Sequence, residues 1–137
     1  MTHLATLLGR LGLSLIFIVS GLGKIPGYAA TQGYMEAMGV PGGLLPLVIA
    51  AEVLGGLAVL FGAWTRWAAL GLAAFSLVSG VLFHGNIADQ TQFIMLMKNI
   101  AIAGGFLALA AHGAGRYSVD AWLGRNPAPG AIAARTA

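Results

Sequence analysis

The amino-acid sequence predicts an all-α membrane protein, a bundle of four transmembrane helices. Of its 137 residues, 58% are hydrophobic and only 8% are charged, whereas roughly a quarter of the residues in an ordinary globular domain are charged. A soluble protein of this size has a high ratio of surface to volume and needs polar residues to cover that surface. The seven basic and four acidic residues are too few to do so. Lipid must therefore surround most of the protein.

The apolar residues are gathered into four long segments of 17 to 20 residues each. At about 1.5 Å per residue, a helix of that length covers roughly 25 to 30 Å, which matches the hydrocarbon core of a bilayer. Backbone groups in lipid must be paired within their own segment, and a helix achieves this. The predicted spans are residues 4–22, 43–62, 67–83 and 93–111.

The connections between the spans are short, apart from the first. Pro26 and Gly27 end the first span, and a Gly-Val-Pro-Gly sequence at residues 39–42 precedes the second. Residues 29–38 between them are expected to form either a short helix at the membrane interface or a solvated connector. Residues 118–123 are expected to form a capped turn anchored by Trp122. We treat residues 1–123 as one membrane domain and expect residues 124–137, rich in Ala and Pro, to be a disordered tail.

The arginines predict the orientation in the membrane. With four spans, both termini lie on the same side, and Arg10, Arg66, Arg116, Arg125 and Arg135 all fall on that side. Positive residues that flank spans favour the cytoplasm. We therefore expect both termini to be cytoplasmic. The net charge of +3 is explained in this way, and the sequence has no basic patch with interleaved aromatic residues that would indicate a nucleic-acid partner.

Three charged residues lie inside the predicted spans: Arg10, Glu52 and Lys98. Ionisable groups at membrane depth cost a few kcal/mol each, so they usually face the bundle interior and pair with one another. Counting from the span ends places Glu52 and Lys98 at similar depth, with Arg10 on the inner side within reach of a long side chain. We therefore expect a buried Arg10–Glu52–Lys98 cluster.

Other polar residues share the helical faces of these charges, and two interpretations of the whole set are open. In one, the charges neutralise each other and fix the order and register of the helices. In the other, they hold the polar head of a ligand or relay protons. The expected polar cluster comprises Arg10, Ser14, Lys24, Glu52, His84, Lys98 and Asn99. Of these, Glu52, Lys98 and Arg10 are the candidates for catalytic residues.

Glycines in the spans are expected to let helices pack closely, because small residues at regular spacing allow two backbones to approach. The expected packing positions are Gly21, Gly55, Gly56, Gly104 and Gly105. A metal or haem site is not expected. The chain has no Cys, and His84 and His112 lie a full bilayer apart, whereas two haem ligands must stand at similar depth.

Several short motifs follow one another along the chain in a characteristic order. They include the runs at residues 52–56 (Glu-Val-Leu-Gly-Gly), 62–66 (Gly-Ala-Trp-Thr-Arg), 83–84 (Phe-His), 98–101 (Lys-Asn-Ile-Ala) and 118–120 (Ser-Val-Asp). Over residues 4–123 this ordered set resembles the DoxX family of small bacterial inner-membrane proteins. The resemblance implies a four-helix membrane bundle in the bacterial inner membrane, with several spans in one chain.

The resemblance also implies a link to redox metabolism. Some members are subunits of a thiosulfate:quinone oxidoreductase, and others associate with redox enzymes at the membrane. We therefore expect a membrane subunit or accessory protein of a redox complex linked to quinone, thiosulfate or thiol oxidants. If the chain is catalytic, Lys98 and Arg10 would polarise a quinone carbonyl or bind an anionic substrate, and Glu52 would carry the proton.

The sequence encodes no group that carries electrons, so these would come from a bound partner protein or a cofactor such as a quinone. The other class of function is non-enzymatic: a membrane scaffold, a chaperone-like assembly factor or a small transporter subunit. The sequence leaves open whether the chain is an enzyme at all. Besides the lipid bilayer, the partners to be expected are a redox enzyme or further copies of the same chain.

Overall fold

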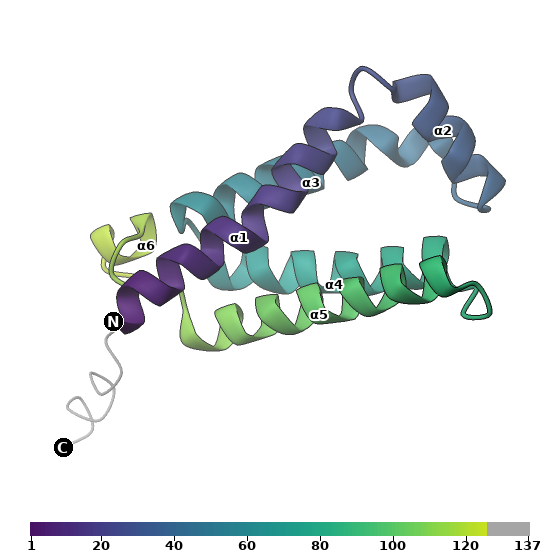
Figure 1. The fold of residues 1–137 in the computed structure, drawn as a ribbon. Coiled ribbons are helices and arrows are strands. Elements are labelled where there is room, and N and C mark those ends of the chain that lie inside the picture. The colour runs from purple at the N-terminus through teal and green to yellow at the C-terminus, as the bar shows by residue number, and fades with distance from the viewer. Residues whose placement is uncertain (126–137) are drawn as a thin grey trace.

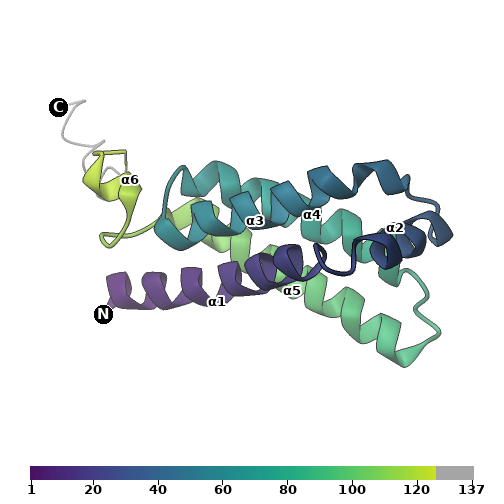
Figure 2. The same cartoon turned by 90° about the horizontal axis from the view of Figure 1, so that it is seen from above.

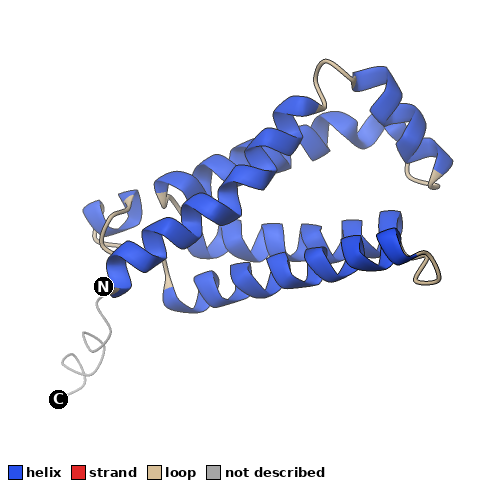
Figure 3. Ribbon diagram, viewed as in Figure 1, coloured by secondary structure: helices blue, strands red, loops and turns tan. Residues whose placement is uncertain are grey.

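The computed structural model describes residues 1–125, so the expected tail lies almost wholly outside the described residues. All regular structure in this part of the chain is helical (Figures 1 and 3). Four helices are long and apolar enough to cross a membrane, which confirms the predicted fold class. The elements in chain order are α1 (Thr2–Gly23), α2 (Tyr28–Ala37), the short 3-10 helix η1 (Gly42–Leu44), α3 (Leu45–Phe61), α4 (Thr65–His84), α5 (Gln90–His112) and α6 (Val119–Trp122).

The helices α1, α4 and α5 run one to three residues beyond the predicted spans at each end. Caps explain part of the extension, because the first N–H groups of a helix need acceptors that hydropathy does not reveal. At the start of α5, Asp89 accepts a hydrogen bond from the Gln92 backbone N–H at 2.9 Å. At the start of α6, the Ser118 hydroxyl accepts from the Ala121 N–H at 3.1 Å, which confirms the expected capped turn. Trp122 in that turn is 85% exposed, so burial of its side chain does not anchor the turn within residues 1–125 as expected.

The four spans form two pairs. The helices α1 and α3 pack along each other, as do α4 and α5, and contacts between the two pairs are fewer. Figure 1 shows the pairs close together near α6 and further apart toward α2. Figure 2, seen from above, shows α6 and the N-terminus at one end of the bundle and α2 at the other. The bundle therefore has a closed end and an open end.

Phe17 joins the two pairs where they begin to diverge. Its ring lies edge-on to Phe106 of α5, with centroids 5.4 Å apart, and edge-on to Phe75 of α4 at 6.1 Å. Edge-to-face contact is a favourable geometry for aromatic rings. The buried core continues toward the closed end through Val59, Ala69, Leu72, Ala73, Ala103, Phe106 and Leu109.

The sequence gives the span of α4 only Ser76 and Ser79 as polar groups, which predicts that this span is the most lipid-exposed. The structure shows that this prediction is wrong. In α4, 28% of the span residues are buried, against 22% in each of the other three. The reason is a stripe of small residues at helical spacing that packs inside the bundle. Its members are Thr65, Ala69, Ala73, Ser76 and Gly80.

Of the two alternatives for the segment between α1 and α3, the structure shows the short helix, α2. It does not rest wholly on the membrane interface, because Met35 is only 4% exposed and points into the protein. Its Gln32 side chain donates a hydrogen bond to the Gly42 carbonyl at 3.2 Å. The helix α2 therefore lies across the open end and is tied to the start of α3.

Most of the expected glycine contacts are present. An added Cβ at Gly56 would lie 2.8 Å from Ile18 Cγ1 and 3.3 Å from the Ser14 carbonyl oxygen, and one at Gly21 would lie 2.7 Å from Val53 Cγ2. At Gly55 and Gly105, a Cβ would come within 3.0 Å of a leucine side chain on a neighbouring helix. The expectation for Gly104 is wrong, because a Cβ there would meet nothing within 4 Å.

Gly56→Ala should destabilise the bundle by about 1 to 3 kcal/mol, because the added methyl group would meet the α1 backbone and force α1 and α3 apart. Gly104→Ala is the matched control, the same substitution on a helix surface with open space. The free energy of unfolding of each variant can be measured by titrating the protein from mild detergent into dodecyl sulfate. Equal stability of the two variants would contradict the close contact between α1 and α3.

Candidate functional site

A hollow lies between the two helix pairs, at the open end beneath α2. Its volume is about 450 Å³, within the usual range for small-molecule sites. Most of its wall is apolar, with Phe17 and Phe75 toward the closed end. The polar side chains in the wall are Ser20, Lys24, Thr31, Glu52, Ser79, His84, Lys98 and Asn99.

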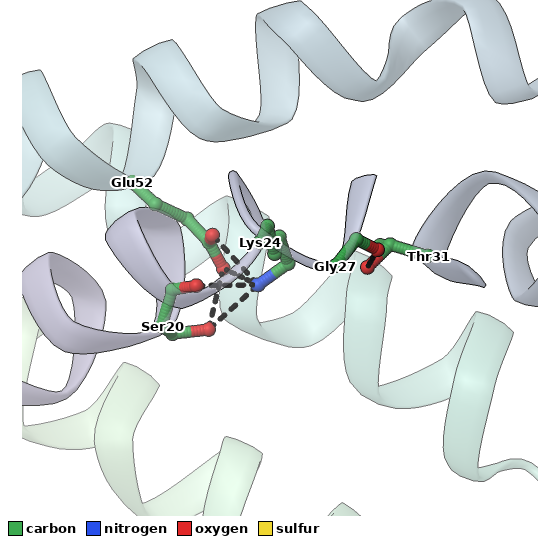
Figure 4. Close-up of polar contacts among 5 residues, drawn as sticks. All are labelled: Ser20, Lys24, Gly27, Thr31 and Glu52. Atoms are coloured by element: carbon green, nitrogen blue, oxygen red, sulfur yellow. Dashed lines mark hydrogen bonds and ion pairs between the residues drawn. The ribbon is translucent and has the colours of Figure 1, made fainter. Parts of the chain in front are cut away.

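One wall carries an ion pair between α1 and α3. The Lys24 Nζ lies 2.8 Å from Glu52 Oε2 and 3.1 Å from Glu52 Oε1 (Figure 4). Lys24 also donates to the Ser20 hydroxyl at 2.6 Å, and that hydroxyl donates to Glu52 Oε1 at 3.3 Å. Because Ser20 lies one helical turn before Lys24, both reach the same carboxylate. The three side chains form a closed hydrogen-bonded triangle in which every charge has a partner.

Packing of the backbones places Glu52 in this triangle. A Cβ at Gly21 would lie 3.1 Å from the Glu52 Cβ, so only glycine at this position lets α3 approach α1 so closely. Glu52 is consequently buried, with 5% of its surface exposed. A carboxylate buried in apolar surroundings is unfavourable unless it is paired. Lys24, with its Ser20 partner, therefore makes the position of Glu52 possible.

The opposite wall comes from α4 and α5. The Asn99 amide donates to the Met95 carbonyl at 3.0 Å, and His84 Nδ1 lies 2.7 Å from Gln92 Oε1. Lys98 has no ion pair within residues 1–125, and its Nζ makes a weak contact with Met95 Sδ at 3.9 Å. The pocket therefore presents a neutralised ion pair on one side and a cation without a counter-charge on the other.

The helix α2 covers the pocket. Thr31, Tyr34 and Met35 belong to its wall, and the Tyr34 ring stacks on Phe83 of α4 with centroids 5.5 Å apart. Thr31 itself is satisfied locally, since its hydroxyl donates to the Gly27 carbonyl at 3.0 Å (Figure 4). The stack between Tyr34 and Phe83 thus joins α2 to α4 at the mouth of the hollow.

Comparison with known proteins identifies the family to which this arrangement belongs. Residues 5–85 match the DoxX family model. The chain belongs to the DoxX family. It is 53% identical over 120 residues to inner membrane protein YqjF of Escherichia coli (strain K12), covering 88% of this chain and 92% of that protein. Inner membrane protein YphA of the same organism is 34% identical, covering 83% of this chain and 86% of its own length.

A third relative is the Bacillus subtilis (strain 168) protein named "Putative oxidoreductase CatD", which is 31% identical and covers 78% of this chain and 85% of its own length. No solved structure shows a significant match. Together with the four apolar spans, these relatives establish that the DoxX chain is an integral inner-membrane protein.

In this DoxX chain, five members of the expected polar cluster stand around one hollow: Lys24, Glu52, His84, Lys98 and Asn99. Whether they bind a ligand stays a prediction. The hollow does not include the other two members. Ser14 is buried on α1 and donates to the Leu11 carbonyl at 3.2 Å.

The expected Arg10–Glu52–Lys98 cluster is wrong. Arg10 lies toward the closed end, where its Nη1 donates to the Ala114 carbonyl at 2.6 Å and its Nη2 to the Leu60 carbonyl at 3.0 Å. These carbonyls belong to the end of α3 and the loop after α5, where backbone acceptors are left over. Backbone oxygens therefore accept from both terminal nitrogens of the guanidinium, whereas its buried Nε has no partner in residues 1–125.

The roles of two side chains in these arrangements were not expected from the sequence. Ser20 completes the ion-pair triangle, and the only sequence signal for it is its spacing of four residues before Lys24. Asp120 accepts hydrogen bonds from the Trp64 N–H at 2.8 Å and the Thr65 N–H at 2.9 Å, and so caps α4 from the far end of the chain. Within residues 1–125, no group of three His, Cys, Asp or Glu side chains could hold a metal ion.

Breaking the ion pair should destabilise the protein more than removing an exposed charge. Glu52→Gln or Lys24→Met alone should cost on the order of 2 to 3 kcal/mol, less than for a fully buried pair because the Lys24 side chain is 23% exposed. The double variant should lose less than the sum of the single losses, because no unpaired charge remains.

Glu36→Gln is the matched control, since Glu36 is an exposed glutamate on α2. The measurement is again the free energy of unfolding in mixed detergent. The pairing would be refuted if Glu52→Gln and Glu36→Gln had the same effect, or if the losses from the two single changes simply added.

Proposed function

We propose that this DoxX chain is a membrane subunit or accessory protein of a redox complex, and that its pocket receives the head group of a quinone or a similar lipophilic carbonyl compound. The observation that carries the proposal is the composition of the pocket wall. A hollow of about 450 Å³ at membrane depth combines aromatic and aliphatic walls with an ion pair and the unpaired Lys98. Few convergent polar groups in an otherwise apolar cavity are typical of binding sites for small organic molecules.

The two walls would have different tasks. The Lys98 ammonium would donate a hydrogen bond to a carbonyl oxygen of the ligand and draw electron density toward it. The hydroxyl of Ser20 lies between Lys24 and Glu52 and could pass a proton between the triangle and the pocket. Phe17 and Phe75 would pack against the ring. A bound quinone would supply the electron-accepting chemistry, and a partner protein would deliver the electrons.

Two facts support a redox role in the membrane. The relative CatD carries the name of an oxidoreductase, and ionisable side chains inside spans usually mark functional sites, because they are costly to keep there. The triangle alone could serve helix register. Lys98 could not fix helix register, because within the described residues it forms no ion pair with a residue of another helix.

We also propose that the closed end faces the cytoplasm and that both termini lie on that side of the membrane. Arg10, Arg66, Arg116 and Arg125 all lie at this end of the bundle, and positive residues beside spans favour the cytoplasmic side. Fusion of a reporter that is active only in the periplasm should give no activity after Leu123 and full activity in the turn at Gly85. The reverse pattern would overturn the orientation.

Lys98→Met tests the ligand proposal directly. Methionine keeps most of the apolar bulk, and the fold should be retained because Lys98 takes part in no ion pair within residues 1–125. Loss of a hydrogen bond from a charged donor should weaken quinone binding by roughly tenfold or more. Binding can be measured by titrating ubiquinone or menaquinone analogues into purified protein in nanodiscs, alone and with co-purified partners.

Arg116→Met is the matched control, since it removes one exposed positive charge outside the pocket. It should bind quinone as the wild type does. If the wild type binds no quinone, either alone or with its partners, the redox proposal is wrong and a scaffold role is left. Equal affinity of Lys98→Met and Arg116→Met would show that quinone binds elsewhere.

A further inference from the structure

The closed end of the bundle differs in charge from the end that holds the pocket. Within the described residues, four arginines stand at the closed end against one carboxylate, whereas two lysines stand at the open end against three carboxylates. Arg10 is buried among backbone oxygens, so the surface charge of the closed end comes from Arg66, Arg116 and Arg125, all of which are exposed. This end therefore carries a positive surface.

All three tryptophans of the chain lie at the same end. Trp64 is 65% exposed, Trp67 is 77% exposed and Trp122 is 85% exposed. Exposed indoles are unfavourable in water but favoured at the boundary between lipid tails and head groups. The tryptophans therefore place the closed end, including the start of α4 and the turn α6 (Figure 2), at the level of the lipid head groups.

A second hollow, of about 160 Å³, lies beside the start of α4. Trp64, Thr65, Arg66, Trp67 and Arg125 contribute to its wall. Thr65 is only 1% exposed, yet its hydroxyl has no hydrogen-bond partner within residues 1–125. A buried hydroxyl of this kind is unfavourable unless something bonds to it. The start of a helix is also a region of partial positive charge.

Asp120 borders the same hollow, and its carboxylate already has partners within the protein. Its two carboxylate oxygens accept the Trp64 and Thr65 N–H groups, and Oδ1 lies 3.9 Å from Arg125 Nη1. Arg125 in turn lies over the Trp64 ring, 5.1 Å from the centroid. Arg66 takes part in no ion pair within the described residues. The hollow therefore keeps a net positive charge.

We propose that this second hollow binds the phosphate of an anionic phospholipid. Arg66 and Arg125 provide the charge, because guanidinium groups form strong charge-assisted hydrogen bonds with phosphate. The Thr65 hydroxyl gains an acceptor, and the exposed faces of Trp64 and Trp67 lie against the glycerol backbone. The lipid is favoured over a soluble anion because the tryptophans hold the hollow at the head-group level, where acyl chains extend along α4.

The test is native mass spectrometry of the purified full chain with added phosphatidylglycerol or phosphatidylcholine. The wild type should retain phosphatidylglycerol in preference to phosphatidylcholine. Each of Arg66→Gln and Arg125→Gln should weaken phosphatidylglycerol retention by about fivefold. Arg116→Gln, the matched control, removes an exposed arginine at the same end but outside the hollow and should retain the lipid as the wild type does.

Thr65→Val gives a second readout that keeps the shape of the side chain. It should unfold at the same temperature as the wild type, or a higher one, without lipid, and should gain less from added phosphatidylglycerol. Circular dichroism establishes that each variant keeps its helical content. The proposal is overturned if Arg66→Gln and Arg116→Gln lose lipid equally, if wild type shows no preference for phosphatidylglycerol, or if millimolar inorganic phosphate displaces the lipid and so reveals a soluble-anion site.

Discussion

A charged side chain at membrane depth must find its counter-charge or its hydrogen-bond partners within the protein, and the architecture of this chain follows from that constraint. The ion pair of Lys24 and Glu52 meets it at the open end, with Ser20 closing the triangle. Backbone carbonyls meet it for Arg10 at the closed end. The contacts of Arg10 tie α1 to α3 and to the loop after α5 at the closed end, and the contacts of Lys24 tie α1 to α3 at the open end.

The two ends differ because their polar clusters bridge different elements. Arg10 joins α1 to the end of α3 and to the loop after α5, and so draws both helix pairs together. The triangle of Ser20, Lys24 and Glu52 joins α1 only to α3, which are already one pair. Beyond Phe17, no side-chain hydrogen bond within the described residues crosses from the first helix pair to the second, and the hollow opens there. The candidate site is thus a consequence of where the chain places its charges.

The sequence predicted the four apolar spans well, because they depend on local patterns, whereas it left open whether residues 29–38 form a short helix or a solvated connector. The length of the apolar segments, the cap at Ser118 and the close-packing glycines Gly21 and Gly56 could be predicted from the sequence. The ion-pair partner of Glu52 could not. Counting residues from the ends of a span fixes depth alone, and by depth Glu52 was paired with Arg10 and Lys98 and not with Lys24. The choice depends on helix rotation and on which pairs of helices pack together. The sequence could not predict the hydrogen-bond acceptors of Arg10, because they are backbone oxygens, which every residue carries.

The most direct measurement is a solid-state NMR distance experiment on the full chain in lipid bilayers. The chain contains only two lysines and two glutamates, so ¹⁵N-lysine and ¹³C-glutamate labelling leaves four possible pairs. The structure predicts one strong dipolar contact, between the Lys24 ammonium nitrogen and the Glu52 carboxylate carbon. The contact should disappear in Lys24→Met and persist in Lys98→Met. A contact that instead disappears in Lys98→Met, or no contact at all, would contradict the arrangement on which the pocket depends.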